Sequence, residues 1–68
     1  MDIGKRLKEL RLEKKLIQAQ VAEILNISRN TYTQYENNTR SISIELLIKL
    51  ADYYNVSLDY MVGRDDWN

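Results

Sequence analysis

Apolar residues recur along the chain at spacings of three and four, which is the period of an amphipathic helix and not the alternation of a strand. Five such segments are separated by short polar breaks. The pattern therefore predicts an all-α fold, a compact five-helix bundle. The expected helices run from about Ile3 to Lys15, Gln18 to Leu25, Arg29 to Asn37, Ile44 to Tyr54 and Leu58 to Val62.

Polar residues at the breaks predict where these helices begin and end. Four side chains with an oxygen acceptor precede a helical segment: Asp2, Ser28, Ser43 and Ser57. Such side chains accept hydrogen bonds from the first free N–H groups of a helix. Asn26 and Asn55 stand where the chain must turn, and Asn tolerates a left-handed backbone better than most residues. Gly63 is expected to end the last helix.

One face of each helix supplies the candidate core. The expected inward residues are Ile3, Leu7, Leu10, Val21, Ala22, Leu25, Tyr32, Tyr35, Ile44, Leu47, Leu50, Ala51 and Tyr54. A chain of 68 residues forms one domain at most. We expect that domain to cover residues 1–63, with a short tail at 64–68.

Composition removes several classes of function. The chain contains no Cys and no His, so disulfides and zinc sites are excluded and no metal or cofactor is expected. No apolar run approaches the roughly 20 residues of a membrane span. The basic N-terminus is not followed by the apolar stretch of a signal peptide. We therefore expect a cytoplasmic protein without membrane contact.

Charge is balanced in total but not along the chain. Ten basic and ten acidic residues cancel, and a neutral chain does not by itself favour a nucleic-acid partner. Residues 1–16 carry six basic against three acidic side chains, whereas residues 44–68 carry two against five. This uneven distribution of charge is explained either by a solvated charged surface or by a basic end that faces phosphate.

The segment from Gln18 to Glu36 has the features of two helices that meet through a short turn. Ala22 is small enough for the second helix to approach the first closely. Asn26 turns the chain, and Ile27 fills the space between the helices. Two inward tyrosines, Tyr32 and Tyr35, anchor the helix at residues 29–37, which leaves the outer face of that helix free to enter a groove.

That outer face carries side chains able to read DNA bases and no carboxylate: Arg29, Asn30, Thr33 and Gln34. Arg pairs in bidentate fashion with guanine, Asn and Gln pair with adenine, and the Thr methyl group suits thymine. Each good pair contributes about 1–3 kcal/mol of discrimination. The alternative is an ordinary solvated polar face, and the absence of carboxylates favours base contacts.

Together these segments resemble a known family. Three stretches carry the resemblance, in this order and spacing: IGKRLKELR, residues 18–36 and SIELLIKLADYYNVSLDYMVG. They are similar to the phage repressor and Cro family of XRE-type helix-turn-helix regulators. The resemblance covers about 60 of the 68 residues. It implies a domain that binds double-stranded operator DNA, usually as a homodimer on an inverted repeat. It further implies a small transcriptional regulator, most often a repressor.

The resemblance also implies roles for single positions. The outer residues of the third helix become base contacts. The phosphate contacts that the resemblance implies are Gln18, Asn37 and Arg40, and Ser28 and Thr31 are further candidates because they could also reach phosphate. Ser28 and Thr31 also have local capping or packing alternatives. Arg11 and Glu36 match a family pair that positions the first helix against the end of the recognition helix.

Four positions depart from the family pattern. Ile17 stands where Ser or Thr is common, which predicts a weaker N-cap for the second helix. Asn26 replaces a turn Gly, and Ile42 stands where the loop often has Pro. Tyr32 replaces a smaller Ile or Val, so a wider core is expected around it.

Surplus aromatic residues gather toward the acidic end of the chain. They are Tyr53, Tyr60 and Trp67, with Leu46 and Ile48 beside them. One interpretation is that they cover a small core. The other is a homodimer surface away from the DNA, since exposed apolar patches often mark interfaces.

Two other classes of function, an enzyme and a protein-interaction module, compete with DNA binding. An enzyme is disfavoured because no nucleophile and base cluster in this sequence. A small bundle also leaves little room for a pocket, so no small-molecule ligand is expected. A protein-interaction module of the same fold, such as an antitoxin or anti-repressor, is the alternative function, because a fold alone does not fix function.

Overall fold

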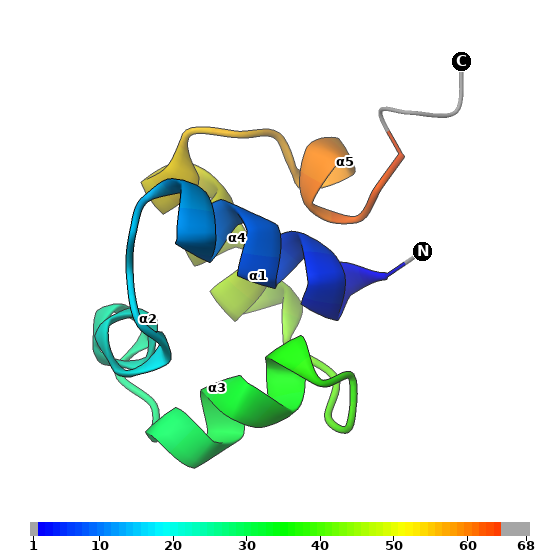
Figure 1. Cartoon of the computed structure of the whole chain (residues 1–68). Coiled ribbons are helices and arrows are strands. Elements are labelled where there is room, and N and C mark those ends of the chain that lie inside the picture. Colours follow the sequence, from blue (N-terminus) through cyan, green and yellow to red (C-terminus); the bar gives the residue numbers. More distant parts are fainter. Residues whose placement is uncertain (1, 65–68) are drawn as a thin grey trace.

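Five helices form in the expected order, within the residues 2–64 that the computed structural model describes (Figure 1). They are α1 (Ile3–Glu13), α2 (Gln18–Leu25), α3 (Arg29–Glu36), α4 (Ile44–Tyr54) and α5 (Leu58–Met61). The predicted all-α five-helix fold is confirmed, and this part of the chain contains no strand. Three helices end one or two residues earlier than expected, namely α1, α3 and α5.

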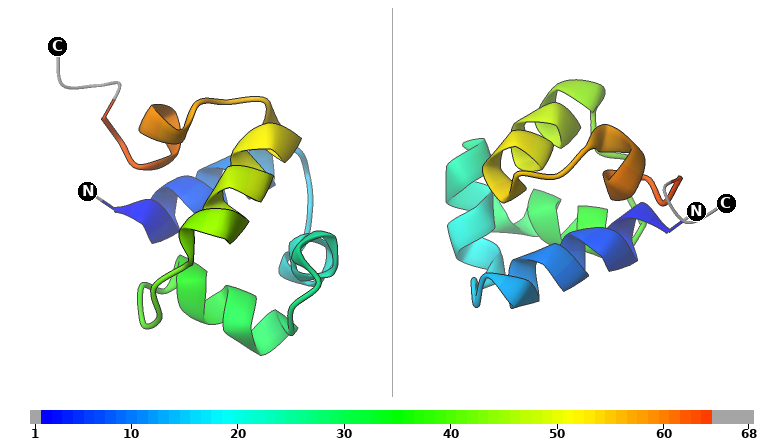
Figure 2. Two further views of the ribbon diagram at one scale, coloured as in Figure 1. Left: turned by 180° about the vertical axis from the view of Figure 1, so that it is seen from behind. Right: turned by 90° about the horizontal axis from the view of Figure 1, so that it is seen from above.

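The packing of the helices leaves one side of α3 uncovered. α3 packs against α1 and α2, whereas α5 packs against α1 and α4 at the other side of the molecule (Figure 1). The view from behind in Figure 2 shows the same separation of α3 from α5. No helix within residues 2–64 is long and apolar enough to cross a membrane.

Every helix contributes to a single core. Its buried apolar residues are Leu7, Leu10, Val21, Ala22, Leu25, Tyr32, Tyr35, Leu47, Leu50, Ala51, Tyr54 and Met61. Ile3 packs at the edge of this cluster. The assignment of Ile44 to the core was wrong, because its side chain is 55% exposed. Ile44 is the first residue of α4, and at about 100° per residue it lies on the border of the buried stripe.

Four of the five helix starts have the expected side-chain cap, and the fifth lacks one, as expected from Ile17. The side chains of Asp2, Ser28, Ser43 and Ser57 each accept a hydrogen bond from a backbone N–H in the first turn of the helix that follows. Ile17 has no side-chain cap hydrogen bond before α2. Gln20 instead accepts from the backbone N–H of Ile17 at 2.9 Å, which fixes the residue before the helix.

All five helices end in the same way. A residue with positive φ follows each last turn: Lys15, Asn26, Asn38, Asn55 and Gly63. The N–H of the next residue then returns to a carbonyl five positions back, as in the bond of 3.0 Å from Ile27 to Ala22. This is the Schellman motif. The turns at Asn26, Asn55 and Gly63 were expected, whereas those at Lys15 and Asn38 were not.

One short segment occurs twice and sets the direction of the following helix. Asn26, Ile27 and Ser28 join α2 to α3, and residues 55–57 (Asn, Val, Ser) join α4 to α5. In each, a left-handed Asn ends one helix, an apolar residue packs against the core, and Ser caps the next helix. Three residues are therefore enough to place α3 against α2.

Replacing Lys15 by Gly should stabilise the fold. Lys15 has a φ of 58°, a conformation that costs a non-glycine residue about 1–2 kcal/mol. Glycine adopts it without strain but loses more entropy on folding. We expect Lys15→Gly to raise the free energy of unfolding by about 0.5–1 kcal/mol. Thermal denaturation followed by circular dichroism should show a melting temperature about 2–8 °C higher.

Lys14→Gly is the matched control for this prediction. It removes the same charge at a position with a φ of −89°, where Gly relieves no strain and lowers helix stability. An equal gain from both substitutions would show that charge, and not backbone conformation, is responsible.

Candidate nucleic-acid interface

The uncovered side of α3 is polar and uncharged at its centre. Asn30 and Gln34 are exposed and, at about 100° per residue, lie opposite the buried Tyr32 and Tyr35. Asn37, the C-cap of α3, is exposed beside them. The side chains of Asn30 and Gln34 make no hydrogen bond within the described chain. They are free to contact a partner.

Two of the predicted base contacts lie instead on the flank of α3 that faces α2. Arg29 is exposed and lines a surface hollow of about 400 Å³ together with Gln18 and Ala19 at the N-terminal end of α2. Thr33 is half-buried, and its hydroxyl is bonded to the side chain of Gln18. The four residues on the outer face are therefore not equivalent.

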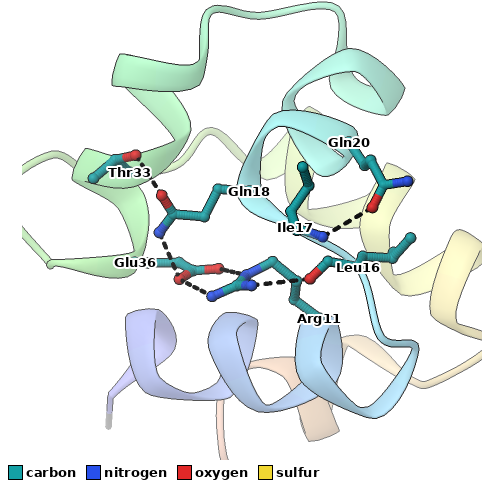
Figure 3. A network of polar contacts seen from close by, with 7 residues as sticks. All are labelled: Arg11, Leu16, Ile17, Gln18, Gln20, Thr33 and Glu36. Atoms are coloured by element: carbon teal, nitrogen blue, oxygen red, sulfur yellow. Dashed lines mark hydrogen bonds and ion pairs between the residues drawn. The ribbon is translucent and has the colours of Figure 1, made fainter.

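A buried ion pair ties α1 to the end of α3 (Figure 3). Arg11 Nε donates to Glu36 Oε2 at 2.7 Å, and its Nη2 donates to Oε1 at 3.2 Å. The remaining Arg11 Nη1 donates to the carbonyl oxygen of Leu16 at 2.9 Å, in the turn before α2. Both charged residues are less than one-tenth exposed. The predicted contact between Arg11 and Glu36 is thus present, and it joins three elements.

Gln18 extends this pair to the outer side of α3. Its Nε2 donates to Glu36 Oε1 at 3.1 Å, and its Oε1 accepts from the Thr33 hydroxyl at 2.8 Å. The amide nitrogen carries two hydrogens, so one remains for the phosphate contact predicted for Gln18. Figure 3 shows the whole path from Thr33 through Gln18 and Glu36 to Arg11.

The environment of the ion pair keeps it charged. Burial alone would raise the pKa of Glu36, but hydrogen bonds from Arg11 and Gln18 outweigh it and lower the pKa. The same bond to Glu36 raises the pKa of Arg11. Burial raises the pKa of the Tyr32 hydroxyl, and it raises that of Tyr54 to about 12. At neutral pH the cluster holds one carboxylate, one guanidinium and two neutral phenols.

Tyr32 fits into the core as a large residue should, but its hydroxyl is not satisfied. Its side chain is fully buried, and its ring meets that of Tyr35 edge to face at 6.5 Å between centroids. The hydroxyl lies near Glu36 yet outside hydrogen-bonding geometry, and within the described chain it has no partner. In the wider core expected around Tyr32, the ring of Tyr35 packs beside it.

Asn38 joins the start of α1 to the loop after α3, a role that the sequence did not suggest. Its Oδ1 accepts from the backbone N–H of Gly4 at 3.1 Å, and its Nδ2 donates to Asp2 at 2.9 Å. A Cβ atom at Gly4 would clash with the carbonyl oxygen of Glu36. A glycine inside a helical pattern is the one sequence signal of this close approach.

The loop after α3 presents the candidate phosphate contact Arg40. The residue is exposed and lines a shallow pocket of about 160 Å³ with Tyr35, Asn38 and Ile42. The candidates Ser28 and Thr31 at the other end of α3 bond to each other, with 2.9 Å between their hydroxyl oxygens. They adopt the capping arrangement that the sequence allowed, and their phosphate contacts stay a prediction.

Comparison with known proteins assigns the fold to a family. A helix-turn-helix family model matches residues 7–61, which is most of the chain. The chain belongs to the helix-turn-helix family. In this helix-turn-helix unit, α2 is the first helix and α3 is the second, the position of the recognition helix in DNA-binding members of this motif. The resemblance predicted from the sequence is confirmed.

Two curated relatives of this helix-turn-helix chain are named as transcriptional regulators. The chain is 44% identical over 66 residues to the HTH-type transcriptional regulator ImmR of Bacillus subtilis (strain 168), covering 97% of this chain and 52% of ImmR. It is 35% identical over 63 residues to the cryptic phage CTXphi transcriptional repressor RstR of Vibrio cholerae, covering 93% and 57%. The chain thus spans about half the length of the curated relatives it matches.

A third relative and a solved structure complete the comparison. The chain is 44% identical over 63 residues to the antitoxin PezA of Streptococcus pneumoniae, covering 93% of this chain and 40% of PezA. A crystal structure of a transcriptional regulator from Listeria innocua superposes with a TM-score of 0.86 at 36% identity. That match covers 90% of this chain and 57% of the other.

Two exposed residues expected near a dimer surface, Tyr53 and Ile48, do not lie on the same edge of α4 in this helix-turn-helix domain. Tyr53 is 45% exposed and lies on one edge of α4, whereas Ile48, 43% exposed, lies on the other edge. Tyr60 is half-buried because Arg6 stacks on its ring at 4.0 Å. Trp67 lies outside the described residues. A dimer surface here stays a prediction.

Breaking the buried ion pair should strongly destabilise the fold. Glu36→Gln keeps the shape of the side chain but leaves Arg11 buried without its counter-ion. We expect the free energy of unfolding at pH 7 to fall by about 3 kcal/mol, measured by urea denaturation. Because folding lowers the pKa of Glu36 from 4.5, its stabilising contribution is present above this pH and is lost as pH falls through the folded value. The two proteins should therefore converge in stability in acid.

Glu9→Gln serves as the control. The Arg6–Glu9 pair is also an arginine–glutamate ion pair, at 3.2 Å, but the Glu9 side chain is 50% exposed, so its loss should change the unfolding free energy by less than about 1 kcal/mol. A difference between Glu36→Gln and the parent that persists unchanged in acid would contradict the role given to the carboxylate.

Proposed function

We propose that this chain binds double-stranded DNA in a sequence-specific manner through α3 and acts as a transcriptional regulator, namely a repressor. The observation that carries the proposal is the uncovered, carboxylate-free face of α3. A helix of this kind fits the major groove, which is about 12 Å wide. The names of the relatives ImmR and RstR, a transcriptional regulator and a repressor, support the same function.

On this proposal the two sides of α3 have different tasks. Asn30 and Gln34 reach adenine edges at the centre of the contact, and Arg29 reaches guanine from the flank beside α2. Gln18 meets phosphate at the N-terminal end of α2, where free N–H groups favour anions. Arg40 meets phosphate on the opposite side. Such a target places the protein in the cytoplasm, and neither catalysis nor a cofactor is needed.

The protein-interaction alternative rests on one observation, the similarity to the antitoxin PezA. Selection of bound duplexes from a random DNA pool at moderate salt distinguishes the two. Strong enrichment of one sequence supports the regulator. Weak, salt-sensitive binding without enrichment indicates general phosphate attraction and favours a protein partner.

Two arginine substitutions should weaken DNA binding in different ways. Arg29→Ala should lower affinity for the selected duplex by about 1–3 kcal/mol and relax preference at one base pair. Arg40→Ala should weaken binding to all sequences alike and reduce the slope of log affinity against log salt by about one. Titrations of selected and scrambled duplexes at several salt concentrations measure both effects.

Arg64→Ala is the control, since Arg64 is exposed after α5, at the opposite side from α3. It should leave both affinities unchanged. Equal, sequence-independent losses for Arg29→Ala and Arg40→Ala would remove Arg29 from base reading. A loss of the same size for Arg64→Ala would show that DNA does not bind at α3.

We further propose that the protein binds its operator as a homodimer on an inverted repeat. The half-sites would then lie about 34 Å apart, one turn of DNA. The exposed Tyr53 supports an interface on its edge of α4, because aromatic residues dominate dimer contacts. This edge belongs to the acidic part of the chain, away from the base-reading face of α3.

Tyr53→Glu should weaken self-association by at least tenfold, since a buried interface aromatic contributes about 2 kcal/mol or more. Sedimentation over a range of protein concentrations measures the dissociation constant. Ile48→Glu, on the opposite edge of α4, should leave it unchanged. The reverse result would move the interface to the Ile48 edge, and a monomer that protects a single half-site would contradict the homodimer.

A further inference from the structure

The direction of each hydrogen bond in the Gln18 network is fixed from one end. The ionised Glu36 carboxylate can only accept, so Gln18 must turn its NH₂ group toward it, at 3.1 Å. A flipped amide would place the Gln18 carbonyl oxygen against a negative charge. The carbonyl oxygen therefore faces Thr33 and, being an acceptor only, requires the Thr33 hydroxyl to donate at 2.8 Å.

This chain of donors and acceptors also fixes the rotamer of Thr33. The threonine Cβ carries a hydroxyl and a methyl group, and turning one of them inward directs the other elsewhere. Figure 3 shows the hydroxyl of Thr33 turned toward Gln18 and the methyl end on the far side. Its hydroxyl proton is used within the protein, so Thr33 has no donor left for a base.

The anchor of this arrangement is rigid. Glu36 is held by two bonds from Arg11, and its side chain is only 3% exposed. Arg11 in turn is bound to the carbonyl of Leu16. The orientation of the Gln18 amide is thus set by buried groups and is not determined by solvent. Through its hydrogen bond to Gln18, this orientation also fixes the hydroxyl of Thr33, although Thr33 is only half-buried.

We propose that Thr33 reads the 5-methyl group of thymine and that Gln18 is the positioning residue that selects this contact. The proposal rests on the DNA binding by α3 proposed above and names the chemistry of one contact within it. Thymine is the only base with a methyl group on its major-groove edge. Burial of one such group contributes about 0.8 kcal/mol, which is about fourfold in affinity.

Thymine-to-uracil substitution tests the contact, because it removes only the methyl group. Each thymine of the duplex selected by the parent protein is replaced in turn, and affinity is measured by titration. The parent should lose about fourfold at one position. Thr33→Ser, which keeps the hydroxyl and lacks the methyl, should show no loss there. Thr33→Val, which keeps a methyl, should retain the loss.

Gln18→Met tests the positioning role. It removes both hydrogen bonds at similar length, so Thr33 can rotate and the uracil penalty should fall below twofold. Gln34→Ala is the control, since it should weaken binding to both duplexes and leave their ratio at about fourfold. Each result is a ratio of two affinities measured on the same preparation, so a partly unfolded variant does not distort it.

The outcomes separate the two proposals. If the parent selects a duplex but is indifferent to uracil at every position, the thymine contact is wrong and DNA binding stands. The same holds if Thr33→Ser keeps the full penalty. A full penalty in Gln18→Met would remove the positioning role of Gln18. Failure to select any duplex would contradict the proposed function itself.

Discussion

The buried pair of Arg11 and Glu36 is the constraint on which the arrangement of the domain depends. One guanidinium holds the end of α3, the turn before α2 and its own helix together. Two charges removed from water are unfavourable unless their bonds are nearly complete. The surrounding elements must therefore approach to within hydrogen-bonding distance at the same time. This fixes the angle at which α3 packs against α1 and α2.

Close packing at the other end of α1 adds a second point of attachment to the end of α3. Gly4 lies directly against the carbonyl of Glu36, and Asn38 bonds to the backbone of Gly4. With α1 held at both ends, α3 cannot swing about either contact alone. A helix that is to place side chains on base edges needs such support, because small errors in position cost specificity.

Most of the fold could be predicted because its signals are local. Side-chain caps such as Ser28 and turn residues such as Asn26 act within three or four residues, so the helix starts and three of the five turns that end the helices were found. The left-handed Lys15 was missed because nothing in a lysine side chain favours that conformation. Ile44 was misplaced because a stripe is poorly defined at its first residue.

The contacts that could not be predicted join distant positions or depend on rotamers. Asn38 and Gly4 are 34 positions apart, and Arg6 covers Tyr60 across 54. The bond from Thr33 to Gln18 requires both the crossing of α2 and α3 and one orientation of an amide. Residue types alone identify such side chains as polar surface and do not show which of them are already bonded.

The separation between bonded and free residues on α3 has an evolutionary consequence. Asn30 and Gln34 are exposed and support neither the core nor a cap, so under the proposed DNA binding, mutations there would alter the preferred DNA sequence while the fold persists. A change at Thr33 would also disturb Gln18 and, through it, the carboxylate of Glu36. Related domains should therefore diverge quickly at the first pair of positions, whereas Gln18 and Thr33 should change together.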